Sequence, residues 1–263
     1  AARRIWARWL KERYGAKDEA SMRLRFHTQT AGVSLTAQQP MNNVARTALE
    51  ALAAVLGGTQ SLHTNALDEV LALPTEDAAK LALRTQQIIA YETGVADVID
   101  PLGGSYFLES LTNRMEELAE EELARIESMG GGSMLEGVLA GIERGYFQQE
   151  IAESAYREQE RYEKGRLAKV GVTEFVEDRE EPIEILQIPH RVEADQIRRV
   201  KEVRERRDEA AAQGALEGLT AAAGTEQNLV PPLIDCARAL CTEGEIVGAL
   251  REVFGEFTET PRF

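Results

Sequence analysis

The stretch Arg23-Leu-Arg-Phe-His-Thr-Gln-Thr-Ala-Gly32 decides how the rest of the chain is interpreted. Apolar and polar residues alternate through it. The apolar positions are Met22, Leu24 and Phe26, and the polar positions are Arg23, Arg25, His27 and Gln29. Because successive side chains of a strand point to opposite faces, this alternation predicts a strand with one polar face.

A helix and a second short strand are expected to follow. Apolar residues recur at helical spacing from about Pro40 to Leu56, a proline is tolerated in the first turn, and Gly57-Gly58 would end the helix. Gln60–His63 then takes the place of the next strand. Strand, helix and strand in this order predict parallel pairing, in which strands are normally buried on both faces. A polar face there breaks the rule, and such exceptions tend to mark functional sites.

Both expected strands deliver polar side chains toward their carboxyl ends. The first strand brings His27 and Gln29, and the second brings Gln60, His63 and Asn65. In a β/α barrel, the active site lies at this end of the strands.

Several motifs in the chain resemble one known family. They are Arg25-Phe-His-Thr-Gln-Thr-Ala-Gly32, Leu35-Thr-Ala-Gln38, Asn42-Asn-Val-Ala-Arg46, Gly57-Gly-Thr-Gln-Ser-Leu-His-Thr-Asn65 and Asp100-Pro-Leu-Gly-Gly-Ser-Tyr106. Together they strongly resemble the large, substrate-binding subunit of the adenosylcobalamin-dependent acyl-CoA mutases, the family of methylmalonyl-CoA mutase. The resemblance covers nearly the whole chain.

The resemblance implies an α/β fold: the carboxyl-terminal part of a (β/α)8 TIM barrel followed by a mostly helical extension. Residues 1–105 would hold the last strands and helices of the barrel. Residues 106–263 would form the helical extension and linker region, with two short strands at 169–175 and 183–188. The helix expected over residues 1–14 matches one deep inside the family's barrel, so the chain is expected to be the carboxyl-terminal portion of a larger polypeptide.

Other helices follow from apolar periodicity and from capping residues. Thr75 would cap a helix that ends near Glu92, with Glu76 and Asp77 in its first turn. Further helices are expected over residues 108–130, 134–144 and 147–164, over a heavily charged stretch at 192–212, and as a pair within 228–254.

The resemblance also implies site residues. Arg25, His27 and Gln60 would bind the substrate, and Gln29, Gly32, Asn65, Glu69 and Val70 would bind the cofactor. Asn65 and Glu69 are four residues apart, so they would share a face if their segment begins a helix. From the residues alone, His27 could instead be a hydrogen-bonded core histidine and Gln60 a strand amide. Arg46 could bind phosphate, but a salt bridge that locks a loop to the barrel is the preferred assignment, and Asp100 is also assigned a structural role.

The chain offers no catalytic residue and no metal ligand of its own. The Asp-x-His-x-x-Gly motif, whose histidine ligates cobalt in this enzyme class, is absent from the sequence. A formal net charge of −15 argues against nucleic acid or an anionic membrane as partner. The spacing of Cys236 and Cys241 suits neither a zinc site nor a redox pair. The sequence shows no signal peptide and no apolar run of membrane-spanning length, so a cytoplasmic location is expected.

The resemblance therefore predicts part of an enzyme that isomerises acyl-CoA carbon skeletons by a radical 1,2-shift of the thioester group. It would need adenosylcobalamin, an acyl-CoA substrate, a small cobalamin-binding subunit and the remaining amino-terminal part of the large subunit. Methylmalonyl-CoA, isobutyryl-CoA and 2-hydroxyisobutyryl-CoA are the candidate substrates. The alternative is a non-catalytic assembly module that docks a cobalamin-binding partner.

Overall fold

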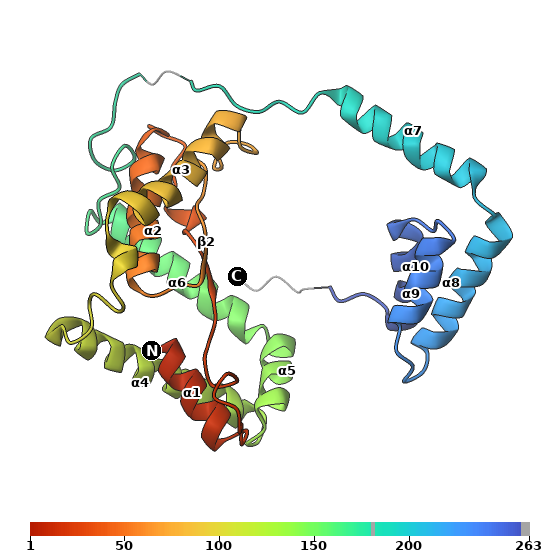
Figure 1. The fold of residues 1–263 in the computed structure, drawn as a ribbon, viewed down its shortest axis with the longest axis horizontal. Coiled ribbons are helices and arrows are strands. Elements are labelled where there is room, and N and C mark those ends of the chain that lie inside the picture. Colours follow the sequence, from red (N-terminus) through yellow and green to blue (C-terminus); the bar gives the residue numbers. More distant parts are fainter. Residues whose placement is uncertain (180–181, 259–263) are drawn as a thin grey trace. The chain divides into compact units, whose positions relative to one another are not determined.

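The computed structural model describes residues 1–179 and 182–258, and its regular structure is mostly helical with one two-stranded parallel sheet. The chain divides into two compact units, one formed by Ala1–Leu186 and the other beginning at Gln187 (Figure 1). The boundary expected between residues 105 and 106 falls within the first unit, where helix α4 begins.

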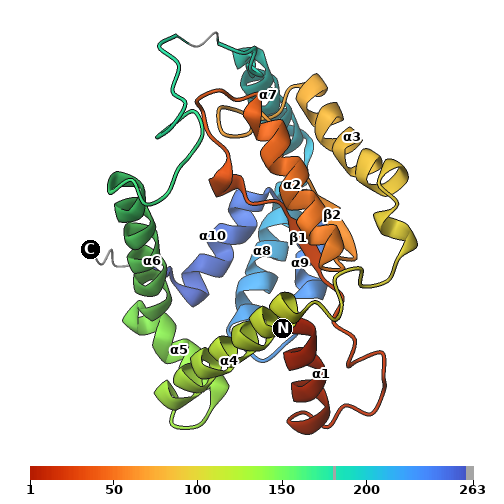
Figure 2. The same cartoon turned by 90° about the vertical axis from the view of Figure 1, so that its left-hand side faces the viewer.

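The sheet of the first unit consists of β1 (His27–Gln29) and β2 (Ser61–His63). The strands are parallel, with His27 opposite Ser61 and Gln29 opposite His63. Helix α2 (Asn42–Leu56) connects them and packs against α3 (Glu76–Glu92), as Figure 2 shows. The predicted strand–helix–strand order is confirmed. Within the described residues the sheet has only these two strands, so the structure shows an α/β unit and not a closed barrel.

A cluster of small buried side chains joins α3 to the segment that follows β2. Ala66, Ala78 and Ala82 form a buried cluster against which Leu67 packs. The predicted cap of α3 is confirmed, because the Thr75 side chain accepts a hydrogen bond from the backbone N–H of Ala78. The turn before α3 and the helix itself therefore hold the residues that follow β2.

A helical layer continues the first unit. It comprises α4 (Tyr106–Met129), α5 (Met134–Arg144) and α6 (Tyr146–Glu163), close to the predicted bounds. Helices α4 and α5 touch at their backbones, since a Cβ added to Gly137 would lie 2.0 Å from the carbonyl oxygen of Ile126. Helix α1 (Ala2–Glu12) lies along α4 through ion pairs that include Arg8 with Glu116 and Glu120 at 2.5 Å.

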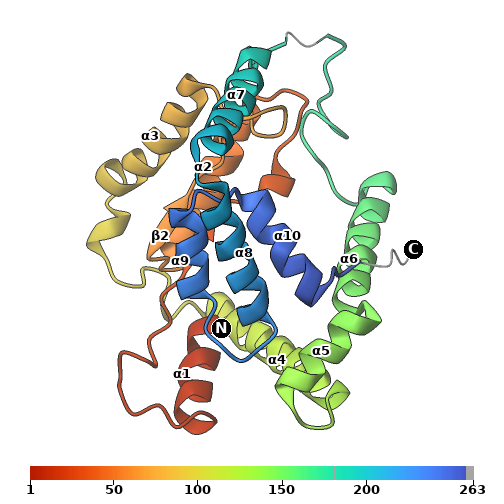
Figure 3. The ribbon, with the colours of Figure 1, turned by 90° about the vertical axis from the view of Figure 1, so that its right-hand side faces the viewer.

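The second unit is helical. It contains α7 (His190–Arg206), α8 (Glu209–Ala223), α9 (Val230–Arg238) and α10 (Glu243–Phe254), and α8 packs against both α9 and α10 (Figure 3). The prediction of a single charged helix over residues 192–212 is wrong. Helix α7 ends at Arg206, and α8 begins after Asp208. The Asp208 side chain caps α8 by accepting a hydrogen bond from the backbone N–H of Ala211 at 3.0 Å.

The prediction of two strands after α6, at residues 169–175 and 183–188, is also wrong. Residues 169–175 form a compact turn in which the backbone N–H groups of Val172 and Thr173 both donate to the carbonyl of Lys169. Gly171 has a φ of +80°, which reverses the chain there. Residues 183–188 are described without regular structure. Every helix within residues 1–179 and 182–258 is too short or too polar to cross a bilayer.

Candidate functional site

The polar face predicted for the first strand is present and open. Met22, Leu24 and Phe26 are partly buried, whereas Arg25, His27 and Gln29 are exposed. Opposite residues of paired strands project to the same side of the sheet. His27 and Gln29 therefore share a face with Ser61 and His63, their partners on β2. The alternation in the sequence thus identified a real surface of polar side chains, and within this chain His27 is exposed and hydrogen-bonded to Ser61.

Hydrogen bonds tie the beginnings of the two strands together. Nδ1 of His27 lies 2.7 Å from Oγ of Ser61. The Gln60 amide accepts from the backbone N–H of Phe26 at 2.8 Å and donates to the carbonyl of Gly58 at 2.9 Å. Gln60 therefore joins the strands as a structural amide, and its contact with a substrate stays a prediction.

The carboxyl ends of the strands are locked by Thr30 and Asn65. The Thr30 hydroxyl donates to Oδ1 of Asn65 at 2.6 Å and accepts from the backbone N–H of Asn65 at 2.9 Å. Asn65 is only 2% exposed, and its Nδ2 has no hydrogen-bond partner within the described residues. A Cβ added to Gly32 would lie 3.2 Å from that Nδ2. A buried amide donor thus stands unpaired beside a glycine.

The residues after Asn65 form turns and not the start of a helix. Asn65 is buried while Glu69 and Val70 are exposed, so the condition for a shared helix face is not met. Asp68, only 1% exposed, fixes the turn because its Oδ2 accepts from the backbone N–H of Thr75 at 2.9 Å and from its hydroxyl at 3.1 Å. This clamp holds Glu69 and Val70 on the outside of the turn.

The supporting roles of two residues on α2, Glu50 and Asn43, were not predicted from the sequence. Glu50 accepts from the backbone N–H of Ala31 at 2.7 Å and from the Ser34 hydroxyl, which shapes the loop that carries Gly32. Asn43 is fully buried and donates to the carbonyls of Thr36 and Leu67, both at 2.9 Å. Polar residues at the buried positions of a helix were the available signal, since such groups need partners.

The turn at residues 169–175, here called the strap, covers the loop between β1 and α2. Nζ of Lys169 donates to the carbonyl of Val33 at 3.2 Å. Arg46 donates to the carbonyl of Val170 and to the Thr36 hydroxyl, both at 2.8 Å. The salt bridge predicted for Arg46 is wrong, because its partners in the described residues are neutral oxygens of Thr36, Asn43 and Val170; these bonds nevertheless hold the loop in place. At Asp100 the backbone carbonyl closes a turn by accepting from the backbone N–H of Gly103 at 3.0 Å, so the role predicted for its carboxylate stays a prediction.

The site is chemically a set of neutral hydrogen-bonding groups. It offers imidazoles, amides, a serine hydroxyl and one unpaired amide donor, with Arg25 as the cation on the same strand face. Among residues 1–179 and 182–258, no three His, Cys, Asp or Glu side chains gather as metal ligands. Such groups suit the binding and orientation of a ligand rich in carbonyl and hydroxyl oxygens.

Comparisons with known proteins agree with the sequence motifs. Residues 1–256 match the methylmalonyl-CoA mutase family. The chain is 51% identical over 265 residues to the 2-hydroxyisobutanoyl-CoA mutase large subunit of Aquincola tertiaricarbonis, which covers 100% of this chain and 46% of that protein. It is 44% identical over 263 residues to methylmalonyl-CoA mutase of Rhizobium meliloti (strain 1021), covering 99% of this chain and 36% of the relative. The chain therefore spans less than half the length of these relatives.

Proposed function

The chain belongs to the methylmalonyl-CoA mutase family, and we propose that it forms part of the substrate-binding subunit of a coenzyme B12-dependent mutase. This mutase isomerises acyl-CoA carbon skeletons by a radical 1,2-shift of the thioester group. The family is adenosylcobalamin-dependent. The single observation that carries the proposal is the open polar face at adjacent parallel strands, which lies within the residues matched to the family.

The same proposal assigns residues 1–105 to the last strands and helices of a (β/α)8 barrel. Two features support it: the strands are parallel, and a helix makes the crossover between them. A barrel would place the remaining strands on either side of β1 and β2. Its interior would then enclose the face that carries His27, Gln29, Ser61 and His63, and the polar row would line the ligand cavity.

The residues at the strand ends fit a large cofactor with hydrogen-bond acceptors. Nδ2 of Asn65 is buried and unpaired, and such a donor is unfavourable by about 1–3 kcal/mol unless a ligand accepts from it. Gly32, beside Asn65, has no side chain, so a flat ring can approach its backbone closely. When bound, adenosylcobalamin supplies a cobalt–carbon bond that breaks homolytically. Gln29, Gly32 and Val70 would contact the corrin, and Asn65 and Glu69 would hold the ribose hydroxyls.

Arg25, His27 and Gln60 would face the acyl-CoA. The exposed imidazole of His27 can donate to or accept from the thioester, and a guanidinium at Arg25 suits an anionic group. One relative is named as a large subunit, which supports a small cobalamin-binding subunit as partner. The remaining amino-terminal part of the large subunit would complete the cavity, because the chain spans under half of its relatives.

Reconstitution tests the proposal. The full large subunit that contains this chain is combined with a cobalamin-binding subunit and adenosylcobalamin. It is then incubated separately with methylmalonyl-CoA, isobutyryl-CoA and 2-hydroxyisobutyryl-CoA, and the products are separated by liquid chromatography and mass spectrometry. We expect isomerisation of one of these esters.

A matched pair of variants sharpens the test. Gln29→Ala removes a polar group from the proposed site, whereas Gln149→Ala changes an exposed glutamine on α6. Only the first should weaken cofactor binding. An assembled complex that binds neither corrin nor any of the three esters would favour the alternative, a non-catalytic module that docks a cobalamin-binding partner.

A further inference from the structure

The two cysteines of the chain, Cys236 and Cys241, lie at the end of α9. The backbone N–H of Cys241 donates to the carbonyl of Cys236 at 3.0 Å, and the N–H of Leu240 donates to the carbonyl of Ala237 at 3.1 Å. Leu240 has a φ of +61°, in the left-handed region. These bonds and this conformation form a Schellman motif, in which the side chains at the first and last positions contact each other. The helix end therefore brings together two cysteines whose spacing is longer than that of a Cys-x-x-Cys pair.

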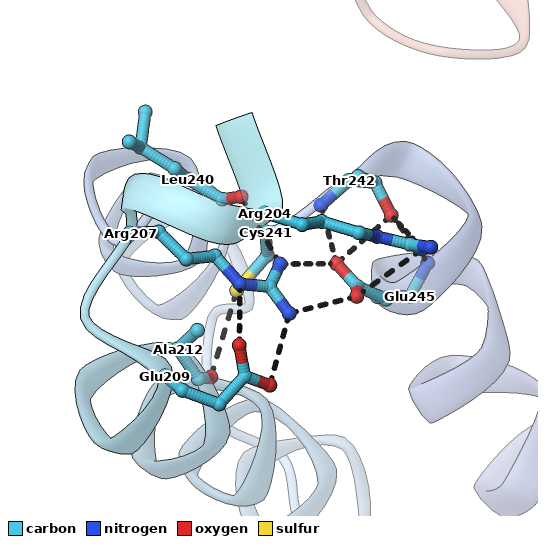
Figure 4. Close-up of polar contacts among 8 residues, drawn as sticks. All are labelled: Arg204, Arg207, Glu209, Ala212, Leu240, Cys241, Thr242 and Glu245. Carbon is cyan, nitrogen blue, oxygen red and sulfur yellow. Dashed lines mark hydrogen bonds and ion pairs between the residues drawn. The ribbon is translucent and has the colours of Figure 1, made fainter. Parts of the chain in front are cut away.

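The two free thiols differ in their access to solvent. Cys236 is fully buried, and burial, followed by the neighbouring Cys241 thiol, raises the pKa of Cys236. Cys241 is half-buried, and its thiol donates to the carbonyl of Ala212 on α8 at 3.5 Å (Figure 4). A reagent in solution can therefore reach the sulfur of Cys241, whereas the sulfur of Cys236 is accessible only to its neighbour.

The pair stands at a corner of the second unit. Cys241 directly precedes Thr242, the residue that caps α10. A bond between the two sulfurs would join the end of α9 to the start of α10, and α8 packs against both of these helices. A single buried cysteine can serve as a small apolar side chain, but two thiols side by side also have a reaction open to them.

We propose that Cys236 and Cys241 form a reversible intramolecular disulfide, with a low-molecular-weight disulfide such as oxidised glutathione as the oxidant. The Cys241 thiolate attacks one sulfur of the oxidant, so that a mixed disulfide forms and one thiolate leaves. The Cys236 thiol then loses its proton and attacks the Cys241 sulfur, and the second thiolate leaves. Each leaving thiolate takes up the proton that a protein thiol has lost. Two protein thiols are oxidised, one oxidant molecule is reduced to two thiols, and the reaction does not depend on the proposed mutase activity.

Tryptic mapping detects the bridge, because the exposed Arg238 lies between the two cysteines. Cleavage after Arg238 separates residues 208–238 from residues 239–251, and each of these peptides carries one cysteine. The folded chain is equilibrated with oxidised and reduced glutathione, its remaining thiols are alkylated, and it is digested and analysed by mass spectrometry. We expect the two peptides to stay joined by a bond that dithiothreitol breaks.

Single substitutions separate the two steps. Cys236→Ser should leave Cys241 as a mixed disulfide with glutathione, because the thiol that attacks it is gone. Cys241→Ser should leave Cys236 as a free thiol, because the oxidant cannot reach it. Glutathione on Cys236 in the Cys241→Ser variant would overturn the proposed order of attack. If Cys236→Ser fails to fold, the wild-type map and Cys241→Ser still test the bridge and the order.

The same titration in urea tests whether the fold favours the bridge. With reduced glutathione held constant, we expect the folded chain to reach half oxidation at about a tenfold lower concentration of oxidised glutathione than the unfolded chain. By linkage, the disulfide then moves the unfolding of the second unit to higher urea. Three results overturn the proposal: a mixed disulfide at Cys241 that persists in the folded wild type, linkage between two copies of the peptide 239–251, or a folded chain that needs as much oxidant as the unfolded one.

Discussion

Glu245 fastens the junction between α7 and α8 to the start of α10 (Figure 4). Its carboxylate accepts two hydrogen bonds from Arg207, at 2.7 and 2.9 Å, and two from Thr242, at 2.7 Å from the backbone and 2.9 Å from the hydroxyl. The Arg207 side chain is only 4% exposed. The hydrogen bonds from Arg207, above all, lower the pKa of Glu245 to about 2. We therefore predict that Glu245→Gln destabilises the second unit.

The size of the effect follows from the pKa. A fall from the ordinary 4.5 to about 2 corresponds to about 3 kcal/mol of stabilisation near neutral pH, at about 1.4 kcal/mol per unit. The folded pKa lies below the unfolded one, so this stabilisation is fully present above about pH 4.5. It is lost as pH falls toward 2, where both states are protonated. The gap between wild type and Glu245→Gln should therefore shrink across this range.

Urea unfolding followed by two probes measures the effect. Both tryptophans, Trp6 and Trp9, lie in α1, so their fluorescence reports the first unit. Circular dichroism at 222 nm reports the helices of both units. At pH 7, Glu245→Gln should move part of the dichroism transition to lower urea and leave the fluorescence transition in place.

Glu252→Gln is the matched control, because it removes the same charge from an exposed position on the same helix. It should change the unfolding free energy by less than about 0.5 kcal/mol. The reasoning is refuted if both variants shift the transition equally. A gap between Glu245→Gln and wild type that is as wide at pH 2.5 as at pH 7 would refute it as well.

Three further predictions concern the first unit, and a fourth concerns α8 of the second unit. Gly32→Ala places a Cβ about 3.2 Å from Nδ2 of Asn65 and should weaken adenosylcobalamin binding by the reconstituted mutase about tenfold, measured by titrating the corrin absorbance. Arg46→Gln removes the bond to the strap and should speed amide hydrogen exchange over residues 33–39 and 169–175, while exchange in α5 stays unchanged. Gly137→Ala should lower the melting temperature, because its Cβ would lie 2.0 Å from the carbonyl oxygen of Ile126. Gly214→Ala, with no atom within 4 Å, should instead stabilise α8 by about 0.5–1 kcal/mol.

Features set by neighbouring residues could be predicted from the sequence. The alternation of polar residues that ends at Gln29 predicted the exposed strand face, and Thr75 predicted where α3 begins. Both depend on local chemistry: side chains alternate along any strand, and a threonine oxygen can cap the N–H group three residues later. The bounds of α4, α5 and α6 followed from apolar spacing for the same reason.

Features set by distant partners could not be predicted. The strap contains β-branched residues that suggested a strand, but its carbonyls are used by Arg46 and Gln39, more than 120 positions earlier in the chain. The structural role of Gln60 could not be predicted for the same reason, because its side-chain amide accepts a hydrogen bond from the backbone N–H of Phe26. The break between α7 and α8 was missed for a different reason. Asp208 is a good cap in the sequence, and the charged periodicity around it concealed that signal.

The unpaired amide of Asn65 adds support for a ligand at the strand ends, and this support holds for either orientation of the amide. The backbone N–H of Asn65 donates to the Thr30 oxygen, so the Thr30 hydroxyl proton is free to point at the amide. That proton needs an acceptor, which places Oδ1 toward Thr30 and Nδ2 toward Gly32. Rotating the amide by 180° would only exchange the atoms and leave Oδ1 unpaired instead. A buried polar atom beside a glycine therefore remains in both cases, and a bound group that hydrogen bonds to it would remove this unfavourable energy.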